Sequence, residues 1–180
     1  MNEEVKTEVF KEALSWAKTV VLAVVLALCI NNVVIVNAKI PSGSMMDIIM
    51  PDDRIVAFRL SYVLSPPERY DIVVFRYPDE RSTLFVKRVI GLPGETVRIA
   101  DGRVYIDGGA APLDDYYVPE KPLGDFGPYE VPEGFYFMLG DNRNNSKDSR
   151  YWINTYVDSG DILGKVVFRY YPNLEILYGK

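Results

Sequence analysis

An almost uninterrupted apolar run near the N-terminus constrains this chain more than any other feature. Residues 20–36 read VVLAVVLALCINNVVIV and contain no charged side chain. Extended to residues 19–38, the run would form a helix of about 20 residues and about 30 Å, which is long enough to cross a bilayer. We therefore expect a transmembrane anchor at residues 19–38 and a separate folded part at residues 39–180.

Other interpretations of this run stay open. A helix buried in a protein core would accommodate Asn31 and Asn32, which weaken a membrane span. A cleavable signal sequence would explain the small side chains at alternate positions in residues 36–38, although the run is long for such a segment. An interfacial amphipathic helix fits least, because the run is apolar on all sides.

Charged residues before the run predict the orientation of the anchor. Lys6, Lys11 and Lys18 precede it, and the glutamates that accompany them weigh little in the positive-inside rule. We therefore expect residues 1–18 in the cytoplasm and residues 39–180 on the outer side of the cell membrane.

Composition excludes several classes of protein. The chain has no histidine, so a Ser-His-Asp triad, a Cys-His dyad and a His-ligated zinc site are excluded. A formal net charge of −5 gives little support to nucleic-acid binding, which needs a concentrated basic surface. The single cysteine, Cys29, cannot form an intramolecular disulfide. We expect no metal ion, no other cofactor and no nucleic-acid partner.

Short apolar or alternating runs, separated by turn signals, predict an all-β fold after the anchor. Asp101-Gly102 between two alternating runs is the clearest hairpin. Residues 110–132 carry five prolines and little periodicity, so we expect a long loop or a small appendage there. The expected strands cover residues 54–58, 71–77, 84–90, 96–100, 103–106, 135–139 and 165–171, with at most a helical turn or two at residues 48–50 or 152–155.

Two short motifs offer a serine nucleophile and a lysine base. Ser42 and Ser44 follow the apolar run directly, and Lys87 lies inside a strand-like run. Strand alternation places Phe85 and Val89 on the same face as Lys87, where burial would favour the neutral amine. Within this window alone, an ordinary exposed basic pair at a strand edge remains the alternative.

A polar block at residues 140–150, GDNRNNSKDSR, follows the expected strand at residues 135–139. Its side chains could cap their own backbone as an ordinary loop. They could equally supply a buried network of hydroxyl, carboxylate and guanidinium groups.

Taken together, these features resemble bacterial type I signal peptidase, the membrane-anchored Ser-Lys form. The resemblance runs from about residue 10 to residue 172 and rests on the anchor and four motifs. These are residues 41–45 (PSGSM), 70–75 (YDIVVF), 86–95 (VKRVIGLPGE) and 140–150. It implies a signal-peptidase-type barrel of antiparallel strands with one N-terminal transmembrane helix.

The resemblance also implies roles for individual residues. Ser44 matches the nucleophile and Lys87 the general base. Ser42 matches the hydroxyl that forms the oxyanion hole together with the Ser44 backbone N–H. Ser146 matches the hydroxyl that orients the lysine amine. Supporting positions are also implied: Asp148 and Arg150 match a structural ion pair behind the site, and Met45 a residue that lines it.

The reaction implied is removal of N-terminal signal peptides from exported preproteins, with cleavage after small residues at positions −3 and −1. The implied partners are those signal peptides and membrane lipid, and the sequence leaves the oligomeric state undecided. One departure concerns Asp47-Ile48-Ile49, where the family commonly has Pro-Thr-Leu, and it affects the expected pocket rim. A peptide-binding β-domain without catalysis and a Ser-Lys autoprotease of the SOS repressor kind are the competing functions.

Overall fold

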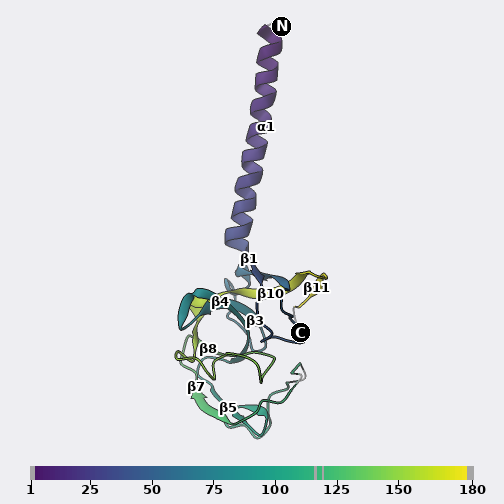
Figure 1. Ribbon diagram of the computed structural model, residues 1–180. Coiled ribbons are helices and arrows are strands. Elements are labelled where there is room, and N and C mark those ends of the chain that lie inside the picture. Colours follow the sequence, from purple (N-terminus) through teal and green to yellow (C-terminus); the bar gives the residue numbers. More distant parts are fainter. Residues whose placement is uncertain (1–2, 116, 119, 178–180) are drawn as a thin grey trace.

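A long helix stands apart from a β-rich part in the computed structural model, which describes residues 3–115, 117–118 and 120–177 (Figure 1). The helix α1 spans Glu3–Cys29. Among the described residues, one helical segment is long and apolar enough to cross a membrane, and it spans Phe10–Val34. No part of its most apolar stretch is buried inside the protein. Residues 1–2 of the expected cytoplasmic segment and residues 178–180 of the expected outer part lie outside the described residues.

The apolar helix ends earlier than the expected boundary at residue 38. After α1, a single π-helical segment, η1 (Ile30–Val34), leads directly into strand β1 (Ile35–Lys39). The residues around this boundary, Val33 to Val36, are all β-branched, and such side chains favour a strand over a helix. Residues 35–38 of the expected anchor are therefore part of the sheet.

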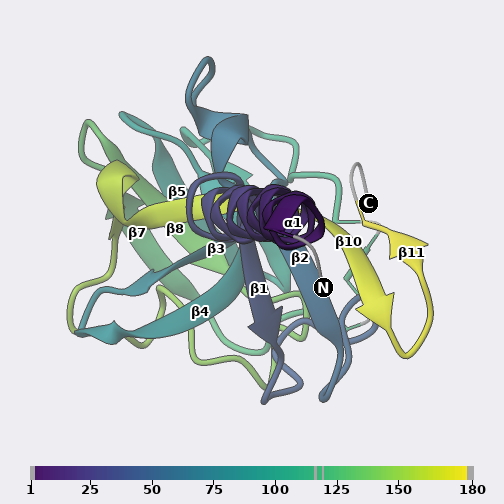
Figure 2. The same ribbon diagram turned by 90° about the horizontal axis from the view of Figure 1, so that it is seen from above.

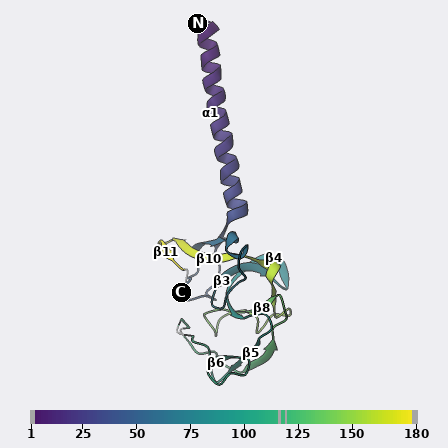
Figure 3. The same cartoon turned by 180° about the vertical axis from the view of Figure 1, so that it is seen from behind.

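The main sheet has eight strands, and its pairings are antiparallel. Its order is β1-β2-β10-β3-β4-β8-β9, with β11 added to β10. The sheet curls strongly beneath α1, as the views from two opposite sides show (Figures 1 and 3). The strands are β2 (Arg54–Phe58), β3 (Ile72–Tyr77), β4 (Glu80–Gly91), β8 (Phe135–Leu139), β9 (Val157–Asp158), β10 (Ile162–Tyr171) and β11 (Glu175–Ile176).

A second, three-stranded sheet lies at the end of the molecule that is farthest from α1 (Figure 1). It has the order β6-β5-β7, with β5 at Thr96–Ala100, β6 at Arg103–Ile106 and β7 at Phe126–Glu130. The predicted hairpin is confirmed, since Ala100 pairs with Arg103 and both turn residues have positive φ. Residues 110–132, where a long loop or a small appendage was expected, contain strand β7, so a loop does not cover the whole range. Residues 116 and 119 of this range lie outside the described residues.

The prediction of an all-β fold with one N-terminal helix is confirmed. Short helical segments occur at η2 (Arg59–Tyr62) and η3 (Ser159–Asp161). Near Ile48, one of the two places that the sequence suggested, the chain forms a turn in which the Ile49 N–H donates to the Met45 carbonyl, whereas residues 152–155 are not described as helical. Among the described pairings, the main sheet runs as an open path from β1 to β9, so closure into a barrel stays a prediction. Seen from above, α1 stands over β1, β2 and β10 (Figure 2).

Candidate active site

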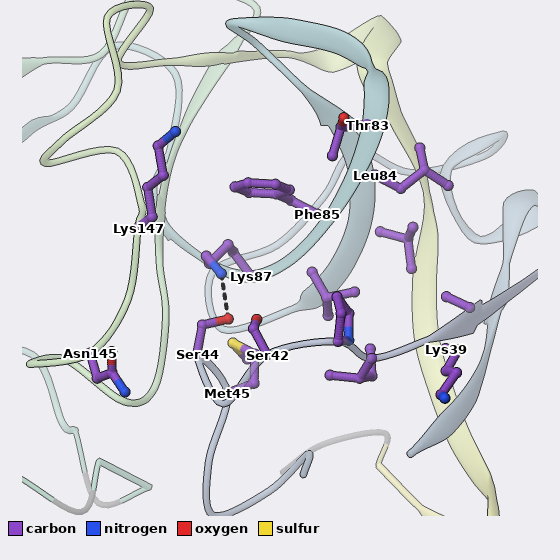
Figure 4. Close-up of a pocket in the computed structure, with 15 residues that line it drawn as sticks. Lys39, Ser42, Ser44, Met45, Thr83, Leu84, Phe85, Lys87, Asn145 and Lys147 are labelled. Carbon is purple, nitrogen blue, oxygen red and sulfur yellow. Dashed lines mark hydrogen bonds between the residues drawn. The ribbon is translucent and has the colours of Figure 1, made fainter. Parts of the chain in front are cut away.

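Ser44 and Lys87 meet in a buried part of the molecule. Lys87 lies on β4 opposite Val73 of β3, and Ser44 lies in the turn that follows β1. The Lys87 Nζ donates a hydrogen bond to the Ser44 Oγ at 2.5 Å (Figure 4). Lys87 is 3% exposed and Ser44 is 8% exposed. The structure therefore brings together the two residues that the motifs singled out.

Burial changes the titration of Lys87. Desolvation lowers the pKa of its amine from the usual 10.5 to about 8, although Asp148 and Asp141 oppose the shift. The Phe85 ring, two residues earlier on the same face of β4, lies 5.3 Å from the Lys87 Nζ. This ring stacks in turn on Tyr77, with 4.4 Å between the ring centroids. An aromatic wall thus shields the amine from water on one side.

A cavity of about 560 Å³ opens beside the two residues. Residues 38–42 form one of its walls and residues 83–87 of β4 another (Figure 4). Ser42 is exposed and lines the cavity together with Ser44. Apolar side chains make up most of the lining as a whole, and they include Leu84, Val86 and Val74.

Gly140 allows the polar block to approach the serine turn closely. A Cβ atom at this position would lie 2.5 Å from the Ser44 carbonyl oxygen and 2.2 Å from the Ser146 Oγ. Asn142 ties the two segments together, because its side-chain amide donates to the Gly43 carbonyl at 3.0 Å and its backbone N–H to the Ser44 carbonyl at 3.1 Å. The sequence did not assign a role to Gly140 or Asn142, although both lie inside the block that it singled out.

Ser146 is buried next to Gly140, and its Oγ has no hydrogen-bond partner among the described residues. The hydrogen bond to the lysine amine that the resemblance implies is therefore absent from this structure. Lys147, the next residue, lines the cavity and places its Nζ 4.8 Å from the centroid of the Tyr77 ring. Asn145 also lines the cavity, so the block forms its third wall (Figure 4).

Asp148 and Arg150 form the expected ion pair. The Arg150 Nε and Nη2 each donate to the Asp148 carboxylate at 2.8 Å, and both side chains are buried. Asp148 also accepts from the Gly140 backbone N–H at 3.1 Å, while Arg150 donates to the Arg143 carbonyl at 2.6 Å. The pair therefore fixes both ends of the loop that carries Ser146.

A second buried ion pair, which the sequence did not reveal, joins β4 to the same block. Arg88 follows Lys87, and its Nε and Nη2 donate to the Asp141 carboxylate at 2.8 and 2.6 Å. Both side chains are at most 1% exposed. Because Arg88 and Lys87 are neighbours on β4, they point to opposite faces of the strand, and the pair fixes β4 from behind.

Met45 lies between the site and the core. It lines the cavity, is 1% exposed and packs in a cluster with Ile40, Ile49 and Ile55. Ile49, part of the Asp47-Ile48-Ile49 departure, is fully buried and donates its backbone N–H to the Met45 carbonyl. The departure therefore supplies core contacts beneath the serine turn.

Comparison with known proteins gives consistent similarities. A family model described as "Signal peptidase, peptidase S26" matches residues 13–171. The signal peptidase I of Leptolyngbya laminosa is 44% identical over 163 residues, which cover 86% of this chain and 78% of that protein. Signal peptidase I S of Bacillus subtilis is 35% identical over 177 residues, covering 92% and 93%. A signal peptidase I crystal structure from Enterococcus faecalis has 36% identity and a TM-score of 0.49, covering 56% of this chain and 97% of that chain.

Proposed function

This chain belongs to the signal peptidase family, peptidase S26, whose reaction is the removal of signal peptides, and we propose that Ser44 and Lys87 carry out that reaction here. The observation that supports this assignment most directly is the 2.5 Å contact between the Lys87 Nζ and the Ser44 Oγ. Such a contact lets a neutral lysine take the hydroxyl proton of a serine nucleophile. The chain has no histidine that could serve instead.

In the first half of the reaction, the Ser44 Oγ attacks the carbonyl carbon of the scissile peptide bond. Its proton moves to the Lys87 Nζ, and the carbonyl oxygen becomes an oxyanion. When the C–N bond breaks, Lys87 returns a proton to the departing amine, which is the new N-terminus of the mature protein. The signal peptide then stays bound to Ser44 as an ester.

The oxyanion needs hydrogen-bond donors that are already in place. The Ser44 backbone N–H and the Ser42 hydroxyl are the proposed donors, because Ser42 lines the same cavity as Ser44. Donors fixed before reaction stabilise developing charge without reorganisation at the moment of attack.

In the second half, a water molecule attacks the ester and Lys87 takes one of its protons. The new oxyanion collapses, the Ser44 Oγ leaves and recovers that proton from Lys87, and the signal peptide departs as a carboxylic acid that loses its proton to water. Ser146 has an unpartnered hydroxyl in this structure, so it is able to donate to or accept from a group that arrives during the cycle. We assign it the orientation of the Lys87 amine during turnover.

An extended substrate fits between two free strand edges. Among the described pairings, β1 pairs only with β2, and residues 80–87 of β4 pair only with β3. Both segments border the cavity, so a peptide strand could add its backbone hydrogen bonds to either edge. The apolar lining by Leu84, Val86 and Val74 would then receive the side chains at −1 and −3 and favour small ones.

The proposed location follows from α1. Residues before the apolar segment would lie in the cytoplasm, and the sheets with the cavity would lie on the outer side of the membrane. Ser44 follows β1 within five residues of Lys39, which keeps the site close to the lipid surface. A membrane-bound preprotein presents its cleavage site at a similar height.

Cleavage by the purified full-length protein in detergent tests this function. We expect it to cut a preprotein after its Ala-X-Ala site, and we expect Ser44→Ala to leave the preprotein intact. Ser61→Ala is a suitable control, because Ser61 lies in η2 and does not line the cavity. Cleavage that persists in Ser44→Ala would exclude Ser44 as the nucleophile, and no cleavage by the parent would exclude the enzyme.

A further inference from the structure

The connection between the apolar helix and the sheet contains no irregular linker. Helix α1 passes through η1 into β1, and the backbone N–H of Ile35, the first residue of β1, donates to the Ile30 carbonyl. The helical and extended segments are therefore joined by a hydrogen bond across their boundary. The ribbon runs from α1 straight into the sheet (Figures 1 and 3). A flexible tether between an anchor and a catalytic domain would instead be rich in glycine or serine, which residues 30–39 do not contain.

Polar side chains brace this connection, which we call the junction and define as residues 30–39. The Asn37 side-chain amide, on β1, donates to the Asn31 Oδ1 in η1 at 3.1 Å. Asn32 donates to the Leu28 carbonyl at 2.8 Å, which links η1 back to α1. Arg59, from η2, donates its Nε to the Ile35 carbonyl at 3.2 Å. Asn31 and Asn32, which weaken a membrane span, therefore connect η1 to β1 and to α1 through hydrogen bonds.

The other end of the junction leads to the nucleophile through ordered backbone. All five residues of β1 pair with β2, and Val36 is buried in the core. Beyond β1, Ile40 exchanges backbone hydrogen bonds with Asp53 and Asp52 at 2.9 and 2.8 Å. Ser44 follows four residues later, in the turn that Asn142 holds. Strand pairing and backbone hydrogen bonds therefore hold the chain as far as Ile40, and Asn142 holds it again at Gly43 and Ser44.

We propose that the junction is a specificity determinant that selects signal peptides by the length of chain between their apolar segment and the scissile bond. The inference rests on the proposed function, because it needs α1 in a bilayer and Ser44 as the nucleophile. A braced junction holds Ser44 at one height above the membrane. A substrate that is anchored in the same bilayer must bring its scissile bond to that height, and misplacement by about 1 Å can cost about 10²-fold in rate.

Substrates that differ only in spacer length test the proposal in proteoliposomes. The preproteins share one apolar segment and one Ala-X-Ala site, separated by polar spacers of increasing length. For the parent we expect one best spacer, and a fall in rate of about tenfold or more when it is changed by about three residues. A Gly-Gly-Ser insertion between Val34 and Ile35 should flatten this profile to less than about threefold.

Two controls separate the junction from the chemistry. The same insertion between Gly108 and Gly109, where a turn is exposed far from the site, should keep the parent profile. A short soluble peptide without an apolar segment should be cleaved at one rate by the parent and both insertion variants. If the parent cleaves neither peptide nor preprotein, the proposed function fails. If the peptide is cleaved equally and the spacer profiles of the two insertion variants coincide, only the junction proposal is overturned.

A distance measurement keeps the proposal testable even if the insertion impairs activity. Spin labels on the native Cys29 and on a cysteine introduced by Glu133→Cys report the position of the sheets relative to α1, and the chain has no other cysteine. We expect a narrow distance distribution in the parent, a broader one with the junction insertion, and intermediate broadening in Arg59→Ala. A parent distribution as broad as that of the insertion variant would show that the junction is flexible and would overturn the proposal.

Discussion

Lys87 donates a hydrogen bond to Ser44 across 43 residues of sequence, in a pocket where both side chains are buried. The contact needs two separate supports. Strand β4 holds Lys87 between β3 and the Asp141 block, while Asn142 holds the turn that carries Ser44. Substitutions in either support should therefore affect the same contact.

Replacement of Lys87 by arginine should abolish cleavage as completely as replacement by alanine. A guanidinium stays protonated at any accessible pH, so it cannot take the Ser44 proton, although it keeps the positive charge. Single-turnover cleavage of a preprotein by Lys87→Arg, Lys87→Ala and Ser44→Ala measures this. Because nucleophile and base act as a unit, the double variant Ser44→Ala/Lys87→Ala should be no slower than either single variant. Substantial activity in Lys87→Arg would assign the base to another group.

Activity should rise with pH through a midpoint near the Lys87 pKa of about 8. Only the neutral amine can accept a proton, so the ascending limb of kcat/KM reports its deprotonation in the free enzyme. Stability should change over a higher pH range. Between about 8 and 10.5 the unfolded chain binds a proton that the folded chain has lost, so the free energy of unfolding rises with pH. Lys87→Met should lose this part of the pH dependence of unfolding, and a flat kcat/KM profile from pH 6 to 9 in the parent would contradict the assignment.

Ser42→Ala should lower kcat by about 10² to 10³ and leave KM nearly unchanged, as expected for one of two oxyanion donors. The Ser44 backbone N–H would remain, so the reaction should slow without stopping. Steady-state kinetics on a peptide substrate separate the two constants. Ser82→Ala, an exposed serine on β4, is the matched control and should behave as the parent. A rise in KM at constant kcat would make Ser42 a binding residue instead.

Asp141→Ala should strongly destabilise the fold, by about 3 to 5 kcal/mol, because it leaves the Arg88 guanidinium buried without its carboxylate. Chemical denaturation of the full chain in detergent, monitored by tryptophan fluorescence, gives the free energy of unfolding. Lys39→Ala removes an exposed ammonium group from its pair with Asp52 and should change the free energy of unfolding little. Equal effects of the two substitutions would mean that water reaches the Arg88–Asp141 pair.

The sequence predicted most of the fold and the central pair of the site. Strands β2, β5, β6 and β8 have the expected bounds, because each is a short apolar or alternating run that lies between turn signals. Strand β7 escaped notice, because Gly127 and Pro128 disfavour a strand and its pairing with β5 is a tertiary contact. Strand β1 was hidden because its residues continue an apolar run, and apolarity alone does not separate helix from strand.

The site residues also fall into two groups, those that the sequence predicted and those that it did not. Ser44, Lys87 and the Asp148–Arg150 pair came from motifs, and the structure brings the members of each pair together. The Arg88–Asp141 pair joins motifs that lie 53 residues apart, so no local pattern could reveal it. Strand alternation predicted that Lys87 would be buried beside Phe85 and Val89, with an exposed basic pair as the alternative. The structure buries Lys87, and this burial lowers the pKa of its amine. The role of Ser146 stays a prediction, because its hydroxyl has no hydrogen bond among the described residues.

Ser146→Ala should therefore reduce activity without reducing stability. Its buried hydroxyl makes no hydrogen bond in this structure, so a methyl group in its place should leave the free energy of unfolding unchanged or slightly higher. Turnover should fall, because the variant lacks the hydroxyl to which we assign the orientation of the Lys87 amine during the cycle. Ser149→Ala should do the reverse: its Oγ accepts from the Met138 backbone N–H at 2.9 Å, and the loss of that acceptor costs about 1 to 3 kcal/mol, while cleavage should change less. Denaturation and cleavage measured on both variants decide the matter, and a fully active Ser146→Ala enzyme would remove Ser146 from the mechanism.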